Sequence, residues 1–346
     1  MNRFLLKILF CLSVSFSFLL DGKAQDVEFS QYYANKIYLN PAFAGSDYDS
    51  RIAMGYRNQW PGINEAFLTY SVAYDKYVDV LEGGLGLHIL QDQQGDGAIN
   101  TTMVSGMYSY TLSFSRNFSI RAGFQASLVQ RKLNYNNLTF PDMIDQFYIT
   151  GMINPSTGES LPENLSRDYM DFSGGMLAAY KNWFVGVAAH HLSEPDEAFK
   201  EESDYSKLPR KYTFHCGVTI PVFRRGLHQE EYTFSPNFMY QQQSTYKQLN
   251  YGVYLTRNNL MLGVWYRDNL ELEYDAVIFQ VGISKDWWQL SYSYDKTVSK
   301  LIHTNTGAHE FSVLLRFVNY RKSTGNCREN YVRRKRRVGA LKCPRF

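Results

Sequence analysis

The alternation of apolar and polar side chains along short runs is the feature of this sequence that most constrains its fold. The clearest pair of such runs spans residues 287–296 and 308–318. Only a β-strand places successive side chains on opposite faces, so both runs predict strands with one apolar side. Two strands are not stable alone, so further strands must pair with them. The apolar positions are Trp288, Leu290, Tyr292 and Tyr294, then Phe311, Val313, Leu315 and Phe317.

The same alternation recurs from Arg51 onward and predicts fourteen strands. In the fifth, apolar residues at every second position from Phe118 to Leu128 leave Arg121 on the opposite face, where it would lie in a lumen. An even number of strands, several of them about 9–11 residues long, is typical of bacterial outer-membrane β-barrels. The predicted strands are 51–60, 66–78, 83–93, 99–113, 117–131, 169–180, 183–191, 210–222, 230–242, 246–257, 260–267, 275–285, 287–296 and 308–318.

Composition agrees with an all-β membrane protein. Charged residues make up 20% of the chain, and the mean hydropathy is −0.36, which excludes a bundle of membrane helices. Aromatic residues reach 16%, with 27 Tyr and 23 Phe. A barrel whose strands are only half apolar has this kind of composition.

The first residues read as a secretory signal. Arg3 and Lys7 accompany an apolar run that ends at Leu20, and Gly22 and Ala24 supply small residues at a cleavage position. We expect removal of residues 1–24, with an uncleaved anchor helix as the alternative. No later stretch holds the roughly 18 apolar residues of a membrane helix, which leaves an exported soluble protein or a barrel.

The lengths of the links between strands favour the barrel. Long links follow the fifth, seventh and thirteenth strands, at 132–168, 192–209 and 297–307, whereas turns of one or two residues follow several even-numbered strands. Short periplasmic turns and long surface loops are typical of outer-membrane barrels, whereas a soluble all-β protein has no reason to segregate its loops. We therefore expect a periplasmic N-terminal segment at 25–50, a barrel at 51–318, a periplasmic tail at 319–346, and both termini in the periplasm.

Two of the long links differ in composition. Residues 132–168 contain three prolines and are either a flexible surface loop or a cap and docking surface. Residues 192–208 are acidic but lack the ligand spacing and turn glycine of a calcium loop, so we expect solvated surface.

The tail after residue 318 is basic, with ten Lys or Arg and one acidic residue. It could contact anionic lipid, peptidoglycan or an acidic partner in the periplasm, or serve solubility alone. Nucleic acid is not expected as a partner of an exported protein. Cys327 and Cys343 could form a disulfide in an oxidising compartment, and zinc is the weaker alternative. The densest basic run is Arg333, Arg334, Lys335, Arg336 and Arg337.

No catalytic motif, cofactor motif or metal motif is present. His190 and His191 are adjacent and are expected on opposite strand faces, which argues against a shared metal site. His215 is expected to be a hydrogen-bonded residue of the lumen. A hydrolase assembled from distant strands stays open as an alternative, but nothing in the sequence points to an enzyme.

Three short blocks of the sequence form a distinctive set. They lie after the expected signal, on the first strand and at the start of the last strand. Their residues are Phe29, Ser30, Gln31, Asn40, Pro41, Gly45, Arg57, Gln59, Trp60, Gly307, His309 and Glu310. With these blocks the chain resembles the PorP/SprF family from residue 25 to about 318, and the basic tail is not part of the resemblance.

The resemblance implies an outer-membrane barrel of the type IX secretion system of Bacteroidetes. It implies a role in the export and surface attachment of proteins with a type B C-terminal domain, including gliding adhesins, with periplasmic secretion components and outer-membrane lipid as further partners. On this hypothesis, loops 132–168 and 192–208 bind the cargo, while the N-terminal segment and the tail bind periplasmic components or fill the lumen. The rival hypothesis is a transport barrel for hydrophobic or small polar solutes.

Overall fold

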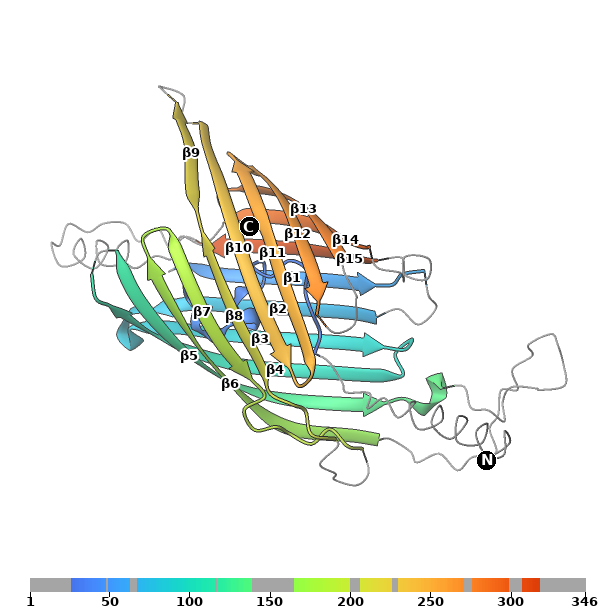
Figure 1. Ribbon diagram of the computed structural model, residues 1–346. Helices are drawn as coiled ribbons and strands as arrows, with labels where there is room; N and C mark the ends of the chain where they lie inside the picture. Colours follow the sequence, from blue (N-terminus) through green and yellow to red (C-terminus); the bar gives the residue numbers. More distant parts are fainter. Residues whose placement is uncertain are drawn as a thin grey trace, which may run out of the picture.

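The structure is a computed structural model that describes residues 26–47, 49–62, 67–115, 117–138, 165–199, 206–225, 230–270, 276–298 and 307–317. Neighbouring strands pair antiparallel, and the last strand returns to the first, which closes the sheet into a barrel (Figure 1). The strands are β1 (Ser50–Gln59), β2 (Phe67–Val78), β3 (Gly83–Gln94), β4 (Ile99–Ser113), β5 (Phe118–Leu133), β6 (Leu165–Tyr180), β7 (Trp183–His190), β8 (Lys211–Val218), β9 (Ile220–Arg225), β10 (Glu230–Gln243), β11 (Tyr246–Arg257), β12 (Leu260–Asn269), β13 (Ala276–Lys285), β14 (Trp288–Thr297) and β15 (Ala308–Phe317).

β8 and β9 together occupy one strand position of the barrel. Both pair with β10, so the fifteen segments make a barrel of fourteen strand positions, which confirms the predicted fold. β7 begins its pairing at Trp183 with Val218, so β9 continues along β10 without β7 on its other side. Pro221 lies in this extension, and an edge strand tolerates a residue that has no N–H to donate. The single strand predicted at 210–222 therefore consists of two segments, β8 and β9, which share one strand position.

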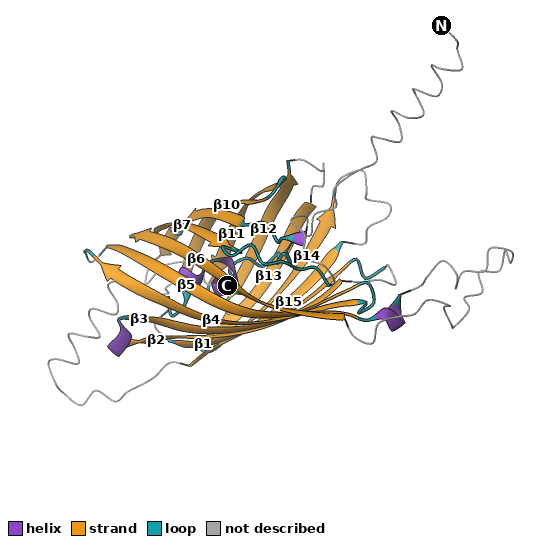
Figure 2. Cartoon of the chain, turned by 90° about the horizontal axis from the view of Figure 1, so that it is seen from below, coloured by secondary structure: helices purple, strands orange, loops and turns teal. Residues whose placement is uncertain are grey.

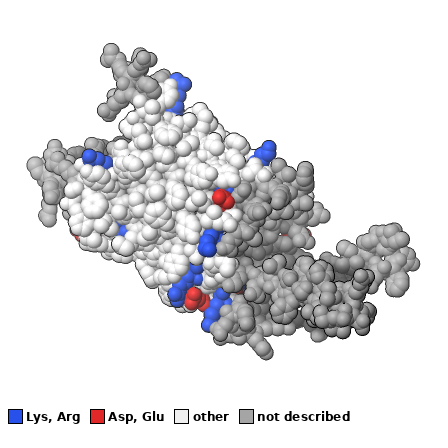
Figure 3. All heavy atoms as spheres, viewed as in Figure 1, with Lys and Arg blue, Asp and Glu red and all other residues white. Residues whose placement is uncertain are grey.

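The barrel is polar inside and apolar outside. On β3, Leu85, Leu87 and Ile89 are exposed on the outer surface, whereas His88 and Asp92 are buried inside. Arg121 on β5 is 1% exposed and points into the lumen, as its place in the alternation predicts. Few charged side chains reach the face seen in Figure 3. No helix in the ranges given above is long and apolar enough to span a membrane.

Residues 26–47, the lumen segment, lie inside the barrel. Ser30 is bonded to β15 and Asn40 to β6, so the segment reaches opposite parts of the wall. Its short helices, α2 (Lys36–Leu39) and η1 (Pro41–Phe43), are enclosed by the strands (Figure 2). Its buried side chains Tyr33, Ile37 and Phe43 form one apolar core with residues of the wall such as Phe184 and Trp265. The N-terminal segment was expected either to bind periplasmic components or to fill the lumen. Its described residues lie in the lumen.

The lumen segment runs between the two ends of the barrel. Asp26 is bonded to His191 and Gln243, which lie at the end that carries the long links 134–164 and 191–210. At the opposite, short-turn end, β1 begins at Ser50 and pairs there with Phe317, where β15 stops. Both chain termini were expected at the short-turn end, but Asp26 lies at the long-loop end. Which end faces the periplasm stays a prediction.

Candidate functional site in the lumen

Glu310 on β15 holds the backbone of the lumen segment. Its Oε2 accepts a hydrogen bond from the Ser30 amide at 2.6 Å, and its Oε1 accepts one from the Gln31 amide at 3.2 Å. The Gln31 side chain donates to the Glu310 carbonyl at 3.0 Å and accepts from the Ser312 hydroxyl at 2.6 Å. Glu310 is 2% exposed, and hydrogen bonds are stronger away from water. One carboxylate therefore fixes the position of two successive peptide groups against β15.

Two arginines balance the buried carboxylates around Ser30. Arg57 on β1 lies 3.2 Å from Glu310 and 3.3 Å from Asp295 on β14. Arg267 on β12 lies 2.9 Å from Asp295. The Ser30 hydroxyl donates to Asp295 at 2.6 Å and accepts from Arg57. An unpaired buried charge is costly, so removal of one of these four charged groups would leave the charge of its partner uncompensated. The ion cluster is Arg57, Arg267, Asp295 and Glu310.

A second group of charges, the Asp26 cluster, fastens the beginning of the lumen segment. The His191 Nε2 lies 2.8 Å from the Asp26 Oδ2, and the His191 Nδ1 lies 2.9 Å from a carboxylate oxygen of Asp171 on β6. Lys211 on β8 lies 3.6 Å from Asp26, and the Gln243 amide donates to Asp26 at 3.2 Å. The cluster therefore joins the lumen segment to three wall strands, β6, β8 and β10. Its members are Asp26, Asp171, His191 and Lys211.

These contacts set the charge state of Asp26 and His191. Burial opposes ionisation of Asp26, but the charges of His191 and Lys211 outweigh it and hold the pKa of that carboxyl well below its ordinary 3.8. Burial also opposes protonation of His191, but Asp26 and Asp171 outweigh it and raise the pKa of that imidazole from 6.5 to about 10. At neutral pH both groups are charged, and the contact between them is an ion pair.

Asn40 and Gly123 fix the middle of the lumen segment. The Asn40 Oδ1 accepts from the Ala42 amide at 2.9 Å and caps η1, whose first residue, Pro41, needs no N–H there. The Asn40 Nδ2 donates to two wall carbonyls, those of Met176 at 3.2 Å and Val187 at 3.0 Å. A Cβ at Gly123 on β5 would lie 2.3 Å from the Ala42 nitrogen, so only glycine lets η1 approach this closely.

Gly45 forms a bend near the end of the lumen segment, shortly before β1. Its φ of +60° suits glycine, and its amide donates to Asp75 on β2 at 2.9 Å. Its carbonyl accepts from Arg121 at 3.2 Å. Asp75 is itself paired with Arg51 at 2.7 Å. The conformation of this bend and the charges beside it therefore depend on each other.

The residues that resemble the family motif fall into two groups. Phe29 packs edge-on against Tyr38, with 5.2 Å between the ring centres, and precedes the residues held by Glu310. The first group lies inside the lumen, where Ser30 and Glu310 are bonded although they are 280 residues apart in the sequence. It consists of Phe29, Ser30, Gln31, Asn40, Pro41, Gly45, Arg57 and Glu310.

The second group lies at the long-loop rim. The Trp60 amide donates to the Gly307 carbonyl at 2.8 Å, which ties the end of β1 to the beginning of β15. The His309 Nδ1 lies 2.8 Å from the Tyr292 hydroxyl, and Gln59 accepts from Arg57 at 3.4 Å. The first of these contacts joins β1 to β15, where the barrel closes. The contact of Tyr292 with His309 joins β14 to β15, and that of Gln59 with Arg57 lies within β1.

Other predicted features lie outside the described residues. These are Cys327, Cys343 and the basic run Arg333 to Arg337, together with 139–164 and 200–205 of the two long loops. Beside the latter gap, Glu197 pairs with Arg131 at 2.6 Å, and Asp196 pairs with Arg167 at 3.9 Å. This part of the acidic loop is therefore tied to the wall, in contrast to the solvated surface that its composition predicted.

The two adjacent histidines correct one expectation. His190 and His191 were expected on opposite faces of a strand, but both line the lumen. β7 ends at His190, and His191 has a φ of +56°, which breaks the alternation. His215 lies in the lumen as predicted, with its Nε2 at 3.2 Å from the Asn40 amide nitrogen. Within the described ranges, no group of three His, Cys, Asp or Glu side chains could hold a metal ion.

Arg267 and Lys211 were missed by the sequence analysis. Both stand on strands whose alternation was recognised, and their polar character at inward positions was the available signal. That signal identifies the lumen face but not the partner of each residue, because pairing across the lumen depends on the path of the lumen segment.

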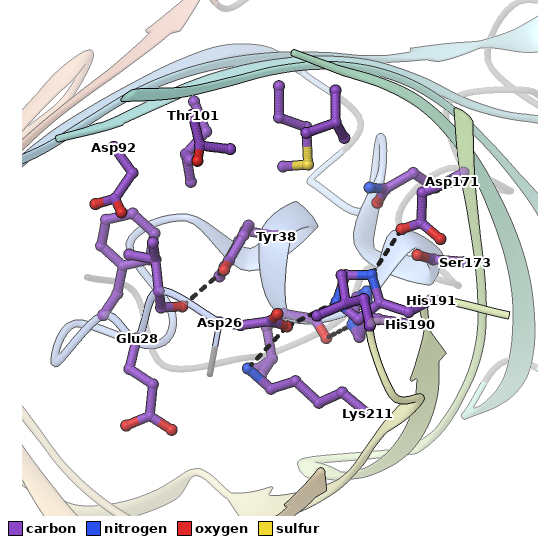
Figure 4. A pocket seen from close by; sticks show the side chains of 18 of the residues that line it. Asp26, Glu28, Tyr38, Asp92, Thr101, Asp171, Ser173, His190, His191 and Lys211 are labelled. Carbon is purple, nitrogen blue, oxygen red and sulfur yellow. Dashed lines mark hydrogen bonds and ion pairs between the residues drawn. The ribbon is translucent and has the colours of Figure 1, made fainter. Parts of the chain in front are cut away.

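A cavity of about 190 Å³ separates part of the lumen segment from the wall formed by β3 to β8 (Figure 4). Asp92 and Thr101 lie on one side of it, and the side chains of Asp26, His191 and Lys211 lie on another. The lumen segment thus stands away from the wall only beside this cavity, whereas η1 packs closely against β5 at Gly123 and Ala44 accepts a hydrogen bond from Ser109 on β4 at 2.7 Å.

The sequence and the fold were compared with those of known proteins. The family described as type IX secretion system membrane protein PorP/SprF matches residues 21–315. A search of curated proteins finds no match. The solved structure of Omp33 from Acinetobacter baumannii is similar with 8% identity and a TM-score of 0.45, covering 78% of this chain and 100% of that one. The toluene transporter TbuX from Ralstonia pickettii is similar with 9% identity and a TM-score of 0.48, covering 86% and 96%.

The family match spans most of the sequence and includes both parts of the structure described above, the lumen segment and the barrel. The matched range includes Ser30, Arg57 and Glu310, which the fold brings together in the lumen. The chain therefore belongs to the PorP/SprF family of type IX secretion system membrane proteins, and it is an outer-membrane β-barrel.

Proposed function

We propose that this protein assists the export and surface attachment of proteins that carry a type B C-terminal domain, such as gliding adhesins. The observation that carries the proposal, beside the family match, is the segment that lies inside the lumen. A solute channel needs a continuous aqueous path. Here the lumen segment extends from the Asp26 cluster at one end to Gly45 and Asp75 near the other. Such a barrel is better suited to holding a partner at its ends than to conducting solutes.

The long-loop end is the proposed docking place for the cargo. Loops 132–168 and 192–208 are the largest links there, and binding residues are often carried by loops on a rigid scaffold. The pair Arg131–Glu197, at 2.6 Å, attaches the second loop to the barrel wall. The lumen segment lies beneath this end and supports the wall from inside.

Loop exchange tests the docking place. Loops 132–168 and 192–208 are replaced by those of a paralogous barrel, and the secreted and surface-attached proteins are identified by mass spectrometry. We expect the cargo to change to that of the paralogue. The matched control exchanges the short-turn link 79–82 and leaves the cargo unchanged. Unchanged cargo in the loop variant contradicts the proposal.

Extraction of the barrel from outer membranes in mild detergent tests the role itself. We expect a surface protein with a type B C-terminal domain, or periplasmic secretion components, to accompany it. A barrel recovered alone, and one that conducts steadily in a planar bilayer, would instead favour the rival function, transport of hydrophobic or small polar solutes.

The basic tail is proposed to contact a periplasmic partner. Replacement of Arg333 to Arg337 by glutamine should weaken the retention of periplasmic proteins during extraction, because a block of positive charge attracts an acidic surface. Replacement of Arg321 and Lys322, which lie outside the dense run, serves as the control. Equal retention by both variants would remove this role.

A further inference from the structure

The cavity beside the lumen segment combines an apolar wall with a buried carboxylate. Leu90, Met103 and Val129 line it from β3, β4 and β5, and the strand register places them side by side, since Met103 pairs with both Leu90 and Val129. Asp92 is the next inward residue on β3 after Leu90 and pairs with Thr101. A carboxylate therefore stands at the edge of a continuous apolar patch.

Most carboxylates that line the cavity already have a cationic partner. Asp26 and Asp171 are paired through His191, and Glu197 is paired with Arg131 at 2.6 Å. Glu28 accepts from the Gln248 amide at 2.7 Å and lies 4.0 Å from Arg267. The positive groups of this region are thus engaged with acidic groups other than Asp92.

Asp92 has only neutral partners among the described residues. It accepts hydrogen bonds from the Thr69 hydroxyl at 2.7 Å and from the Gln94 amide at 2.8 Å, and it forms no ion pair there. Asp92 is 3% exposed. A carboxylate accepts about four hydrogen bonds, so two positions stay open, and a buried charge without a counter-ion is costly. The chemistry on this side of the cavity calls for a cation.

We propose that this cavity binds a primary ammonium group on an aliphatic chain, with the ammonium on Asp92 and the chain on Leu90, Met103 and Val129. An ammonium has three donors and is compact, which suits the two open positions of the carboxylate. The cavity volume of about 190 Å³ is far above the roughly 10–15 Å³ that one water requires, so it has room for a chain of several carbon atoms. A free alkylamine and the lysine side chain of a partner share this chemistry.

The proposal is tested by calorimetric titration of the purified full-length barrel in detergent at neutral pH. The probes are n-hexylamine, hexan-1-ol and Nα-acetyl-lysine methylamide. We expect saturable binding of hexylamine and at least tenfold weaker binding of hexanol, because hydrogen bonds to a charged group are stronger than those between neutral groups. Equal or tighter binding of the lysine derivative points to a partner's side chain, and preference for hexylamine points to a free amine.

Two variants locate the ligand. Asp92→Asn keeps the shape of the side chain and removes its charge, and should weaken hexylamine binding at least tenfold. The matched control is Asp96→Asn, an exposed position in the turn that follows β3, and it should bind like the wild type. Absence of saturable binding of both amines, or equal affinity of the two variants, would overturn the proposal.

Val129→Phe provides a second measurement that does not change any charge. The added ring fills the apolar part of the cavity and should abolish hexylamine binding, with folding of each variant verified by heat-dependent migration on gels. Wild-type affinity in Val129→Phe would mean that the ligand lies elsewhere and would also overturn the proposal. The outcome is independent of the secretion role, which the loop exchange tests separately.

Discussion

The ion cluster and the Asp26 cluster hold the same short stretch of the lumen segment in different ways. The ion cluster sets the guanidinium groups of Arg57 and Arg267 against two carboxylates. The Asp26 cluster depends on an imidazole, that of His191. Arginine keeps its proton in proteins, whereas histidine titrates within a few units of neutral pH. The comparison therefore indicates an attachment at Ser30 that does not depend on a histidine proton and one at Asp26 that does.

The largest expected effect comes from breaking the ion cluster. Glu310→Gln leaves Arg57 without part of its counter-charge and offers the Ser30 and Gln31 amides only one carbonyl oxygen. Removal of one partner of a buried ion pair typically destabilises by about 3–5 kcal/mol. We expect a loss of that size in the free energy of unfolding in urea, together with protease cleavage within residues 26–47.

The matched control for this change is Glu194→Gln. Glu194 pairs with Arg210 at 3.3 Å, but both side chains are more than 40% exposed, and such pairs contribute about 0–1 kcal/mol. Similar losses for the two variants would show that burial of the ion cluster does not matter, and would remove the distinction between the lumen and the surface.

A smaller effect is expected where the lumen segment is held by close approach instead of charge. Gly123→Ala places a methyl group 2.3 Å from the Ala42 nitrogen, and the backbone must shift to accept it. Overpacking of this kind typically destabilises by about 1–3 kcal/mol. Gly106→Ala on β4 is the control, because no atom lies within 4 Å of the added methyl group. Thermal unfolding of both variants, followed by circular dichroism, separates the local clash from a general effect of replacing glycine.

The general form of the fold was predictable from the sequence because alternation is a local property. Each strand was located from its own residues, and the lengths of the links arranged the strands into a barrel with two different ends. The inward position of Arg121 followed from the same alternation. Where a local signal is interrupted, the prediction was wrong, as for His191, whose positive φ follows the end of β7.

The lumen segment was harder to predict because its position depends on contacts distant in sequence. Its first residues mix polar and apolar side chains, and nothing in that stretch alone indicates that Ser30 is bonded to Glu310. Ile37 and Phe43 are buried in the core, but they belong to no alternating run that would place them there. The resemblance between Phe29, Arg57 and Glu310 and a family motif joined the separate blocks without showing that they meet.

The attachment of the lumen segment at the Asp26 cluster should depend on pH. The pKa of His191 is raised from 6.5 to about 10, so its contribution to stability is complete below pH 6.5 and is lost as the pH rises through 10. The pKa of Asp26 is lowered, so its contribution is present above about pH 3.8 and is lost as the pH falls further. The attachment of Asp26 should therefore be strongest between these limits.

Protease cleavage near Asp26, measured from pH 6 to pH 10, tests this prediction. We expect cleavage to increase toward pH 10 in the wild type. In His191→Gln we expect faster cleavage at pH 6 than in the wild type. The increase in cleavage toward pH 10 should be absent from this variant. Attachment at Ser30 should change little over the same range, and an equal pH response at both places would contradict the assignment of the titrating contact to His191.

The smallest effect is expected at the rim, where the motif residues lie outside the lumen. Tyr292→Phe removes the hydroxyl that lies 2.8 Å from His309 but keeps the ring, which packs 4.8 Å from that of Phe311. A single hydrogen bond contributes about 0.5–1.5 kcal/mol, and this one is only partly buried, so we expect a loss at the lower end of that range. The free energy of unfolding in urea, compared with that of Glu310→Gln, measures the difference. A loss equal to that of Glu310→Gln would mean that the junction of β14 and β15 supports the barrel as strongly as the ion cluster does, and that the two groups of motif residues serve one structural purpose.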